Sequence, residues 1–192
     1  MARLLEFDET EALTAAMHAF RRLGYSGVSI KTLEAETGLS SGSIYNSFGG
    51  KDAVFGRAMR HYNDTMVEKR ISEHLDGVTP TEGLVALFES LLDEPNDGAF
   101  GCLLTNSAIE FAGSDTIASA EIRRGFERFL SAFNAALMDV RGADPDAVGR
   151  ASLRLLAYYQ GLLVLIRHGY DKAALRDTVK SEIKGIIGDL DA

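Results

Sequence analysis

Residues 29–48 decide the fold, and they read SIKTLEAETGLSSGSIYNSF. Ser29 and Ser40 each precede a short apolar-periodic run, where a side-chain oxygen can cap the N-terminus of a helix. Gly38 lies between the two runs, at the place where a helix ends on a left-handed residue. The stretch therefore predicts a helix-turn-helix, whose second helix enters the major groove of DNA in proteins that use this motif.

Helical spacing of apolar residues continues on both sides of this stretch. Turn residues divide the chain into nine or so segments, and no alternating run of strand length interrupts them. One segment, residues 51–75, would measure about 37 Å as a single helix. The predicted fold class is all-α, with a three-helix N-terminal domain (residues 1–55), a C-terminal helical domain (residues 56–192), and the boundary inside the long helix.

Composition excludes several classes of protein. The chain has 192 residues, 46% of them hydrophobic, and a net charge of −8. Its one cysteine, Cys102, can form neither an internal disulfide nor a cysteine zinc cluster, which favours a reducing, cytoplasmic setting. The N-terminus lacks a signal-peptide run, and the longest nearly uncharged apolar run, residues 155–166, is too short to span a bilayer, so we expect no membrane partner.

Catalytic motifs are missing from the sequence. It contains no Glu-x-x-His pair, no H-E-x-x-H and no phosphate-binding glycine loop. The four histidines, His18, His61, His74 and His168, are scattered along the chain. We therefore expect neither an enzyme nor a metal or cofactor site.

The second short helix of the motif exposes small or flat hydrogen-bonding side chains. Ser41, Ser43, Tyr45, Asn46 and Ser47 suit phosphates and base edges, and the amide of Asn46 could pair with an adenine edge. Lys51 begins the long helix, where its ammonium and the first backbone N–H groups could meet one phosphate. The pattern alone also allows a small helical bundle whose serines are only solvated caps.

Two stretches carry a resemblance to a known family. Residues 16–25 follow A-x-x-x-F-x-x-x-G-Y, and residues 37–52 read TGLSSGSIYNSFGGKD. In order and spacing this resembles the TetR family of bacterial transcriptional regulators, which implies that residues 1–55 bind DNA and residues 56–192 bind a ligand and dimerise. The residues at positions that touch operator DNA in relatives are Ser29, Lys31, Ser40, Ser41, Ser43, Tyr45, Asn46 and Lys51.

This sequence departs from the family pattern at two positions, and the charge of residues 1–55 is unusual for a DNA-binding domain. Ser41 replaces a frequent lysine, which removes a phosphate contact, and Glu34 stands where a small alanine commonly packs. Residues 1–55 hold five basic and seven acidic side chains, a net charge of −2. DNA binding should therefore depend on a few placed contacts, with a shallow salt dependence.

The C-terminal half is expected to hold a pocket for a small, largely apolar or electrophilic effector. Aromatic walls with a few polar groups suit such a ligand, although the same residues could be ordinary core. Cys102 could be a buried structural residue or, beside a helix N-terminus, an electrophile sensor. The candidates are Tyr62, Met66, Leu87, Leu91, Cys102, Asn106, Phe129, Phe133 and Tyr158.

The eighth predicted helix, opened by Asp144-Pro145, is apolar nearly all round over residues 155–166. Such a helix should be buried both against its own core and against a partner, so we expect a homodimer through the eighth and ninth helices. The combined hypothesis is a ligand-responsive regulator, a repressor by family analogy, that binds a near-palindromic operator as a dimer. The alternative is a helical small-molecule-binding or interaction protein without DNA binding.

Overall fold

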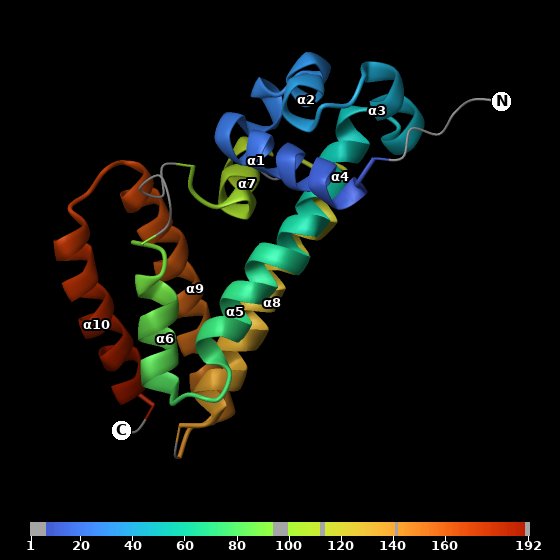
Figure 1. The fold of residues 1–192 in the computed structure, drawn as a ribbon. Coiled ribbons are helices and arrows are strands. Elements are labelled where there is room, and N and C mark those ends of the chain that lie inside the picture. The colour runs from blue at the N-terminus through green and yellow to red at the C-terminus, as the bar shows by residue number, and fades with distance from the viewer. Residues whose placement is uncertain (1–6, 94–99, 112–113, 141, 191–192) are drawn as a thin grey trace. The chain divides into compact units, whose positions relative to one another are not determined.

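The computed structural model describes residues 7–93, 100–111, 114–140 and 142–190, and within these ranges it contains helices and no strand (Figure 1). The predicted all-α class is therefore confirmed. The chain divides into two compact units. The first comprises Met1–Thr65 and Leu103–Ile122, and the second comprises Met66–Cys102 and Arg123–Ala192. The boundary expected between residues 55 and 56 stays a prediction.

The first unit consists mainly of five helices with one aromatic core. Its core includes Phe20, Leu33, Ile44 and Phe55, each at most 1% exposed. The rings of Phe20 and Phe55 meet edge to face with centroids 4.8 Å apart. Its helices are α1 (Glu9–Gly27), α2 (Ile30–Thr37), α3 (Ser41–Phe48), α4 (Lys51–Tyr62) and α7 (Leu103–Phe111).

The predicted caps of the helix-turn-helix are present. The Ser29 hydroxyl accepts from the Thr32 N–H, and the Thr32 hydroxyl accepts from the Ser29 N–H, which makes a reciprocal capping box. Ser40 caps α3 by accepting the Ser43 N–H at 3.2 Å. Gly38 ends α2 with φ 72°, in the left-handed region that glycine enters without a steric penalty. Local sequence thus determines both short helices and the turn between them.

Two helices are interrupted along their length. The helical backbone of α1 breaks at Gly24, where φ is 74° and ψ is 169°, and a short further segment reaches Gly27. The long helix is not uniform either, since a π-helical turn, Asn63–Val67, separates α4 from α5 (Glu68–Leu75). At the start of this turn, the buried Asn63 amide donates to the Glu121 carbonyl oxygen at 2.8 Å. A tertiary hydrogen bond of this kind is not visible in apolar periodicity.

The second unit packs its helices around stacked aromatic rings. Phe88 stacks on Tyr158 with ring centroids 5.5 Å apart, and Phe129 lies 4.7 Å from Tyr159 by the same measure. Within the unit, α6 contacts both α5 and α10. The other helices are α6 (Pro80–Glu89), α8 (Ser119–Met138, which begins in the first unit), α9 (Pro145–Arg167) and α10 (Lys172–Gly188).

The starts of three helices follow the sequence closely. Thr79, Asp144 and Asp171 cap α6, α9 and α10, as their sequences predict. α6 ends at Glu89, and α8 starts at Ser119. In the described ranges, no helix has the length and apolar character needed to cross a membrane.

Candidate nucleic-acid interface and ligand site

The recognition helix of the candidate interface, α3, has one buried and one exposed face. Ile44 and Phe48 are buried in the first unit. Tyr45 is 55% exposed, and Asn46 and Ser47 beside it are exposed as well. An exposed tyrosine on a helix anchored by buried Ile44 and Phe48 offers a flat ring and a hydroxyl to a partner. This is the face that the sequence predicts for DNA contact.

The N-terminus of α3 is closed by side chains of the protein itself. The Ser40 hydroxyl lies 3.0 Å from that of Ser43 and accepts the Ser43 N–H. The Ser41 N–H donates to a Glu34 carboxylate oxygen at 2.6 Å. Glu34 therefore does not disturb packing between α2 and α3. It places a negative charge at the end of the helix that would otherwise attract phosphate.

The two candidates on α2 are both on the surface. Lys31 is exposed, and its ammonium is one of the few positive charges in this unit. Ser29 is exposed too, but its hydroxyl is 2.9 Å from that of Thr32 and takes part in the capping box. Lys31 is accordingly the α2 side chain whose position best suits a phosphate contact.

Lys51 is held at the start of α4 by an aromatic ring. Its ammonium lies 4.1 Å from the centroid of the Tyr25 ring, a cation–π contact. The Tyr25 hydroxyl donates to the Asp52 carboxylate, and this bond raises the pKa of Tyr25 to about 12, with burial adding to the effect. Gly50 precedes α4, and no side chain caps that helix end. In contrast to α3, α4 thus presents an N-terminus without a side-chain cap next to a fixed cation.

Glu110 is a positioning residue that sequence reasoning missed. Its carboxylate accepts the N–H groups of Tyr25 at 2.8 Å and Ser26 at 2.7 Å, just after the break at Gly24. A Cβ at Gly24 would lie 3.0 Å from a Glu110 oxygen, so glycine is required there by both its φ and the close approach. These residues are 84 or more positions apart in sequence, and no local pattern could have paired them.

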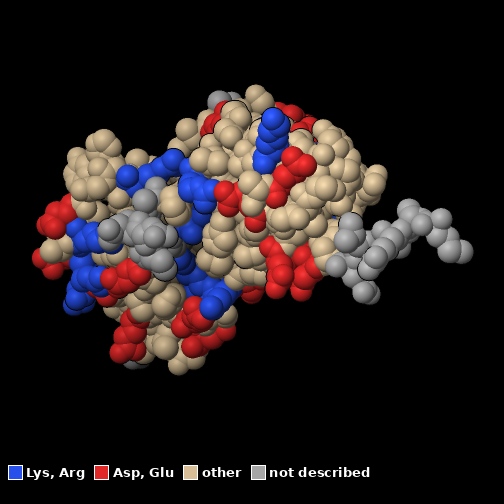
Figure 2. All heavy atoms as spheres, turned by 45° about the horizontal axis from the view of Figure 1, so that its top comes forward, with Lys and Arg blue, Asp and Glu red and all other residues tan. Residues whose placement is uncertain are grey.

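The face that carries α2 and α3 is not basic, as the net charge of −2 over residues 1–55 indicates. On the right-hand side of Figure 2, over α2 and α3, the surface is mostly uncharged, with several acidic side chains and little blue. Bulk attraction of a polyanion is therefore weak on this face, and binding would rest on placed groups.

Most candidates for the effector pocket are packed in the core. Leu87, Leu91, Phe129 and Phe133 are at most 1% exposed, and Tyr158 is half-buried on the ring of Phe88. Cys102, 4% exposed, directly precedes α7. In the first unit, Tyr62 is 7% exposed, and the Asn106 amide donates to the Arg21 carbonyl oxygen at 3.3 Å. A ligand role for these residues stays a prediction.

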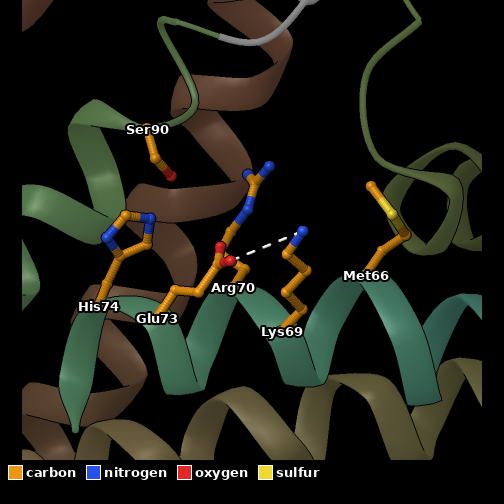
Figure 3. A pocket seen from close by; sticks show the side chains of 6 residues that line it. All are labelled: Met66, Lys69, Arg70, Glu73, His74 and Ser90. Atoms are coloured by element: carbon orange, nitrogen blue, oxygen red, sulfur yellow. Dashed lines mark ion pairs between the residues drawn. The ribbon is translucent and has the colours of Figure 1, made fainter.

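Met66, the remaining candidate, lines a pocket of about 200 Å³ in the second unit. Figure 3 shows the side chains of Arg70 and His74 rising from α5 toward the side on which Ser90 lies. The Arg70 guanidinium donates to the Tyr159 hydroxyl at 3.3 Å. Burial, followed by the nearby Arg70 charge, lowers the pKa of His74 despite the opposing effect of Glu73. The lining comprises Met66, Lys69, Arg70, Glu73, His74 and Ser90.

None of the sequence patterns above predicts this pocket. Five of its residues, 66, 69, 70, 73 and 74, do share one helix face, because they are spaced at three- and four-residue steps. Charged residues at such spacing usually form a solvated helix surface, so only the tertiary structure distinguishes a pocket from an ordinary exposed face. No group of three or more metal-ligating His, Cys, Asp or Glu side chains occurs in the ranges that the structure describes.

Comparison with known proteins adds independent information. Residues 12–58 match the family model described as "Bacterial regulatory proteins, tetR family". The chain is 30% identical over 131 residues to the HTH-type transcriptional regulator YezE of Bacillus subtilis, a match that spans 67% of this chain and 65% of that protein. It is 27% identical over 187 residues to the HTH-type transcriptional repressor Rv1474c of Mycobacterium tuberculosis, covering 91% of each.

Among solved structures, a cysteine mutant of the TetR family transcriptional regulator CifR, complexed with 26-base-pair operator DNA, has a similar fold. The TM-score is 0.80 at 21% identity, and the match covers 95% of this chain and 98% of that one. At this level of identity the likeness concerns the fold.

Proposed function

The chain belongs to the TetR family of bacterial regulatory proteins, and on that premise we propose that it is a ligand-responsive transcriptional regulator that binds operator DNA as a homodimer. A relative named as a repressor, similar over nearly its whole length, favours repression. A structural neighbour crystallised with operator DNA supports the same kind of partner here. We further propose that it acts in the cytoplasm.

The exposed face of α3 carries this proposal. Tyr45 and Asn46 project from a helix whose opposite side is buried, which is the geometry that major-groove contact requires. In the proposed complex, Tyr45, Asn46 and Ser43 meet base edges or phosphates. Lys31 and Lys51 meet phosphates. Ser29, Ser40 and Ser41 lie at the helix ends nearest the sugar-phosphate backbone of the DNA.

A second observation supports the dimer. Over residues 155–166 the exposed positions of α9 hold apolar or small residues, namely Ala157, Gly161 and Val164, the last 50% exposed, and Leu153 just before them is 60% exposed. α10 has an exposed stripe of small residues at helical spacing. Its members are Ala174, Thr178, Ser181, Gly185 and Gly188. Two copies could bury these faces in a four-helix interface and place two α3 helices on a near-palindromic operator.

The proposed response to a ligand takes place in the second unit. An effector in the second unit would alter DNA affinity by binding one state of the dimer more tightly than another. The segment of α4, the π-helical turn and α5 continues from Lys51 into the second unit, so the candidate phosphate contact and that unit are joined directly along the chain.

The deciding experiment removes the proposed DNA contacts and measures binding. Tyr45→Ala combined with Lys51→Ala should abolish the gel shift of the intergenic DNA upstream of the gene. The matched control is Tyr170→Ala with Lys184→Ala, which removes a tyrosine of equal exposure, 56%, and an exposed lysine from the second unit. If the Tyr45→Ala, Lys51→Ala variant binds the DNA like the wild type, the assigned contacts are wrong. If the wild type itself gives no shift, the protein is a helical interaction or ligand-binding module without DNA binding.

A further inference from the structure

A second pocket, of about 280 Å³, lies in the second unit between the start of α9 and the end of α10. Its floor is apolar, because the buried side chains of Ala151, Ile186 and Leu190 line it, each at most 8% exposed. Ala147, which is half-buried, adds to the same surface. A ligand that fills this pocket must therefore place an apolar body against its floor.

The rim of the pocket is charged and carries two arginines and one aspartate. The Arg154 guanidinium donates to an Asp189 carboxylate oxygen at 2.7 Å, which pairs these two charges between α9 and α10. Arg150, one turn earlier on α9, is exposed, and within the described ranges its side chain has neither an ion pair nor a hydrogen bond. The rim thus has one net positive charge, and Arg150 supplies it.

The backbone does not change this balance. The N-terminal end of α9 and the C-terminal end of α10 meet at the pocket, so the opposite partial charges of the two helix ends offset each other. The side chains therefore decide which charge the pocket accepts. A guanidinium presents five N–H donors in one plane, and its fork geometry suits a carboxylate.

Charge and size together restrict the ligand. A cation would meet the charge of Arg150 on the rim, and the second charge of a dianion would lie near the Asp189 carboxylate. One negative charge matches the single arginine that has no partner in the described ranges. The volume is just below the roughly 300–1,000 Å³ of sites for drug-sized ligands, so the apolar body must be short.

We propose that this pocket binds a short-chain amphipathic monocarboxylate, with the carboxylate on Arg150 and the hydrocarbon chain against Ala147, Ala151 and Ile186. The pocket lies at the edge of the α9 face proposed for the dimer, since Arg154 is one helical turn before Ala157. The site is therefore tested in the full chain as it assembles in solution. A role of the ligand as effector rests on the proposed function, but its binding does not.

Isothermal titration calorimetry with sodium acetate, butyrate and hexanoate tests the ligand class, with hexanamide and hexylamine as comparisons of equal length. We expect hexanoate to bind saturably in the millimolar range or better. Affinity should fall by up to about fourfold for each methylene group removed, because that group no longer covers the apolar floor. The proposal is wrong if hexanoate does not bind, if hexanamide or hexylamine binds as tightly, or if acetate equals hexanoate.

Variants of Arg150 test the location of the carboxylate. Arg150→Met should weaken hexanoate binding by about tenfold or more, and Arg150→Lys should weaken it less, because the charge stays and the fork is lost. Both should fold, since Arg150 is exposed. The matched control is Arg123→Met on α8, which removes another exposed arginine without an ion pair or hydrogen bond in the described ranges. It should bind hexanoate like the wild type.

A variant of the floor tests the position of the hydrocarbon chain. Ala147→Leu should weaken hexanoate binding severalfold, because the larger side chain occupies part of the pocket. Ala135→Leu, which adds the same side chain at an exposed position on α8, should have no effect. Hexanoate binding that is unchanged in both Arg150→Met and Ala147→Leu overturns this location.

A gel shift on the same preparations separates this inference from the proposed function. Hexanoate binding without any DNA binding would retain the pocket and overturn the regulator. DNA binding without hexanoate binding would retain the regulator and overturn the pocket.

Discussion

The carboxylate of Glu110 accepts the backbone N–H of Ser26 at 2.7 Å, and by this bond α7 holds the broken end of α1. A second bond, from the Tyr25 N–H, makes the contact bidentate. Tyr25 in turn supports the Lys51 ammonium. The candidate phosphate contact at the start of α4 is therefore positioned by a residue from a helix that lies some fifty positions further along the chain.

Replacing Glu110 should destabilise the protein. Glu110→Gln keeps the shape of the side chain but loses the charge and one of the two acceptors, and we expect a loss of about 1–2 kcal/mol in the free energy of unfolding. Chemical denaturation of the variant and the wild type measures the difference. Glu127→Gln, on the exposed surface of α8, is the control. Equal stabilities for all three proteins would show that the hydrogen bonds contribute nothing net.

The effect should depend on pH. Burial raises the pKa of Glu110, but the hydrogen bonds from Ser26 and Tyr25, together with Lys51 nearby, outweigh it and lower the pKa below its ordinary value. The stabilisation is therefore present above the pKa of the unfolded chain and is lost as pH falls through the folded pKa. The stability difference between wild type and Glu110→Gln should shrink on going from pH 7 to acid conditions, and a difference that grows would contradict this assignment.

Glu34 should limit DNA affinity. Its carboxylate accepts the Ser41 N–H at the N-terminus of α3, where a DNA phosphate would otherwise be favoured. Glu34→Gln preserves an acceptor but removes the charge, so affinity for any DNA sequence should rise, most strongly at low salt. Fluorescence anisotropy with operator and unrelated duplexes gives both affinities. Glu36→Gln, on the same helix and paired with Arg22, serves as the control. Weaker binding by Glu34→Gln would mean that its charge is needed for cap geometry.

Salt dependence should be shallow. Lys31 and Lys51 are the candidate phosphate contacts in each head, so a dimer displaces few counterions, and the slope of log affinity against log salt should be about −4 or shallower. Titrations at several salt concentrations measure it. A slope near −10 would reveal phosphate contacts that the described surface does not indicate.

Gly161 offers a clean test of the dimer. A Cβ there would meet nothing within 4 Å in the described residues, and leucine has a higher helix propensity than glycine, so Gly161→Leu should leave the subunit folded. In a close-packed interface the added side chain would clash, and light scattering should show dissociation. Ser131→Leu, at an exposed position on α8, should not change the mass. A Gly161→Leu protein that remains dimeric would exclude this part of α9 from the interface.

Cys102 should react slowly. Its thiol is 4% exposed, and an alkylating or disulfide reagent must wait for local opening. The reaction rate in the native protein should therefore be orders of magnitude below that of the unfolded chain. Fast reaction that also releases DNA, absent in Cys102→Ser, would instead identify the residue as a sensor.

The sequence by itself determined the local elements of this protein. Ser29, Gly38 and Ser40 specify the two short helices and their turn, since capping and left-handed backbone depend on residues only a few positions apart. The buried and exposed faces of α3 could be assigned in the same way, because helical spacing also relates residues only a few positions apart. The sequence also indicated the unusual apolar surface of α9, because helical periodicity assigns residues to faces.

Only the tertiary structure decided what lies between distant segments. Glu110 reaches Ser26, Asn63 interrupts the long helix by bonding to Glu121, and Tyr159 orients Arg70, and each of these contacts joins residues 58 or more positions apart. Hydrogen bonds and pockets form where helices cross. The crossing depends on packing of the whole core, and no pattern within one helix encodes it.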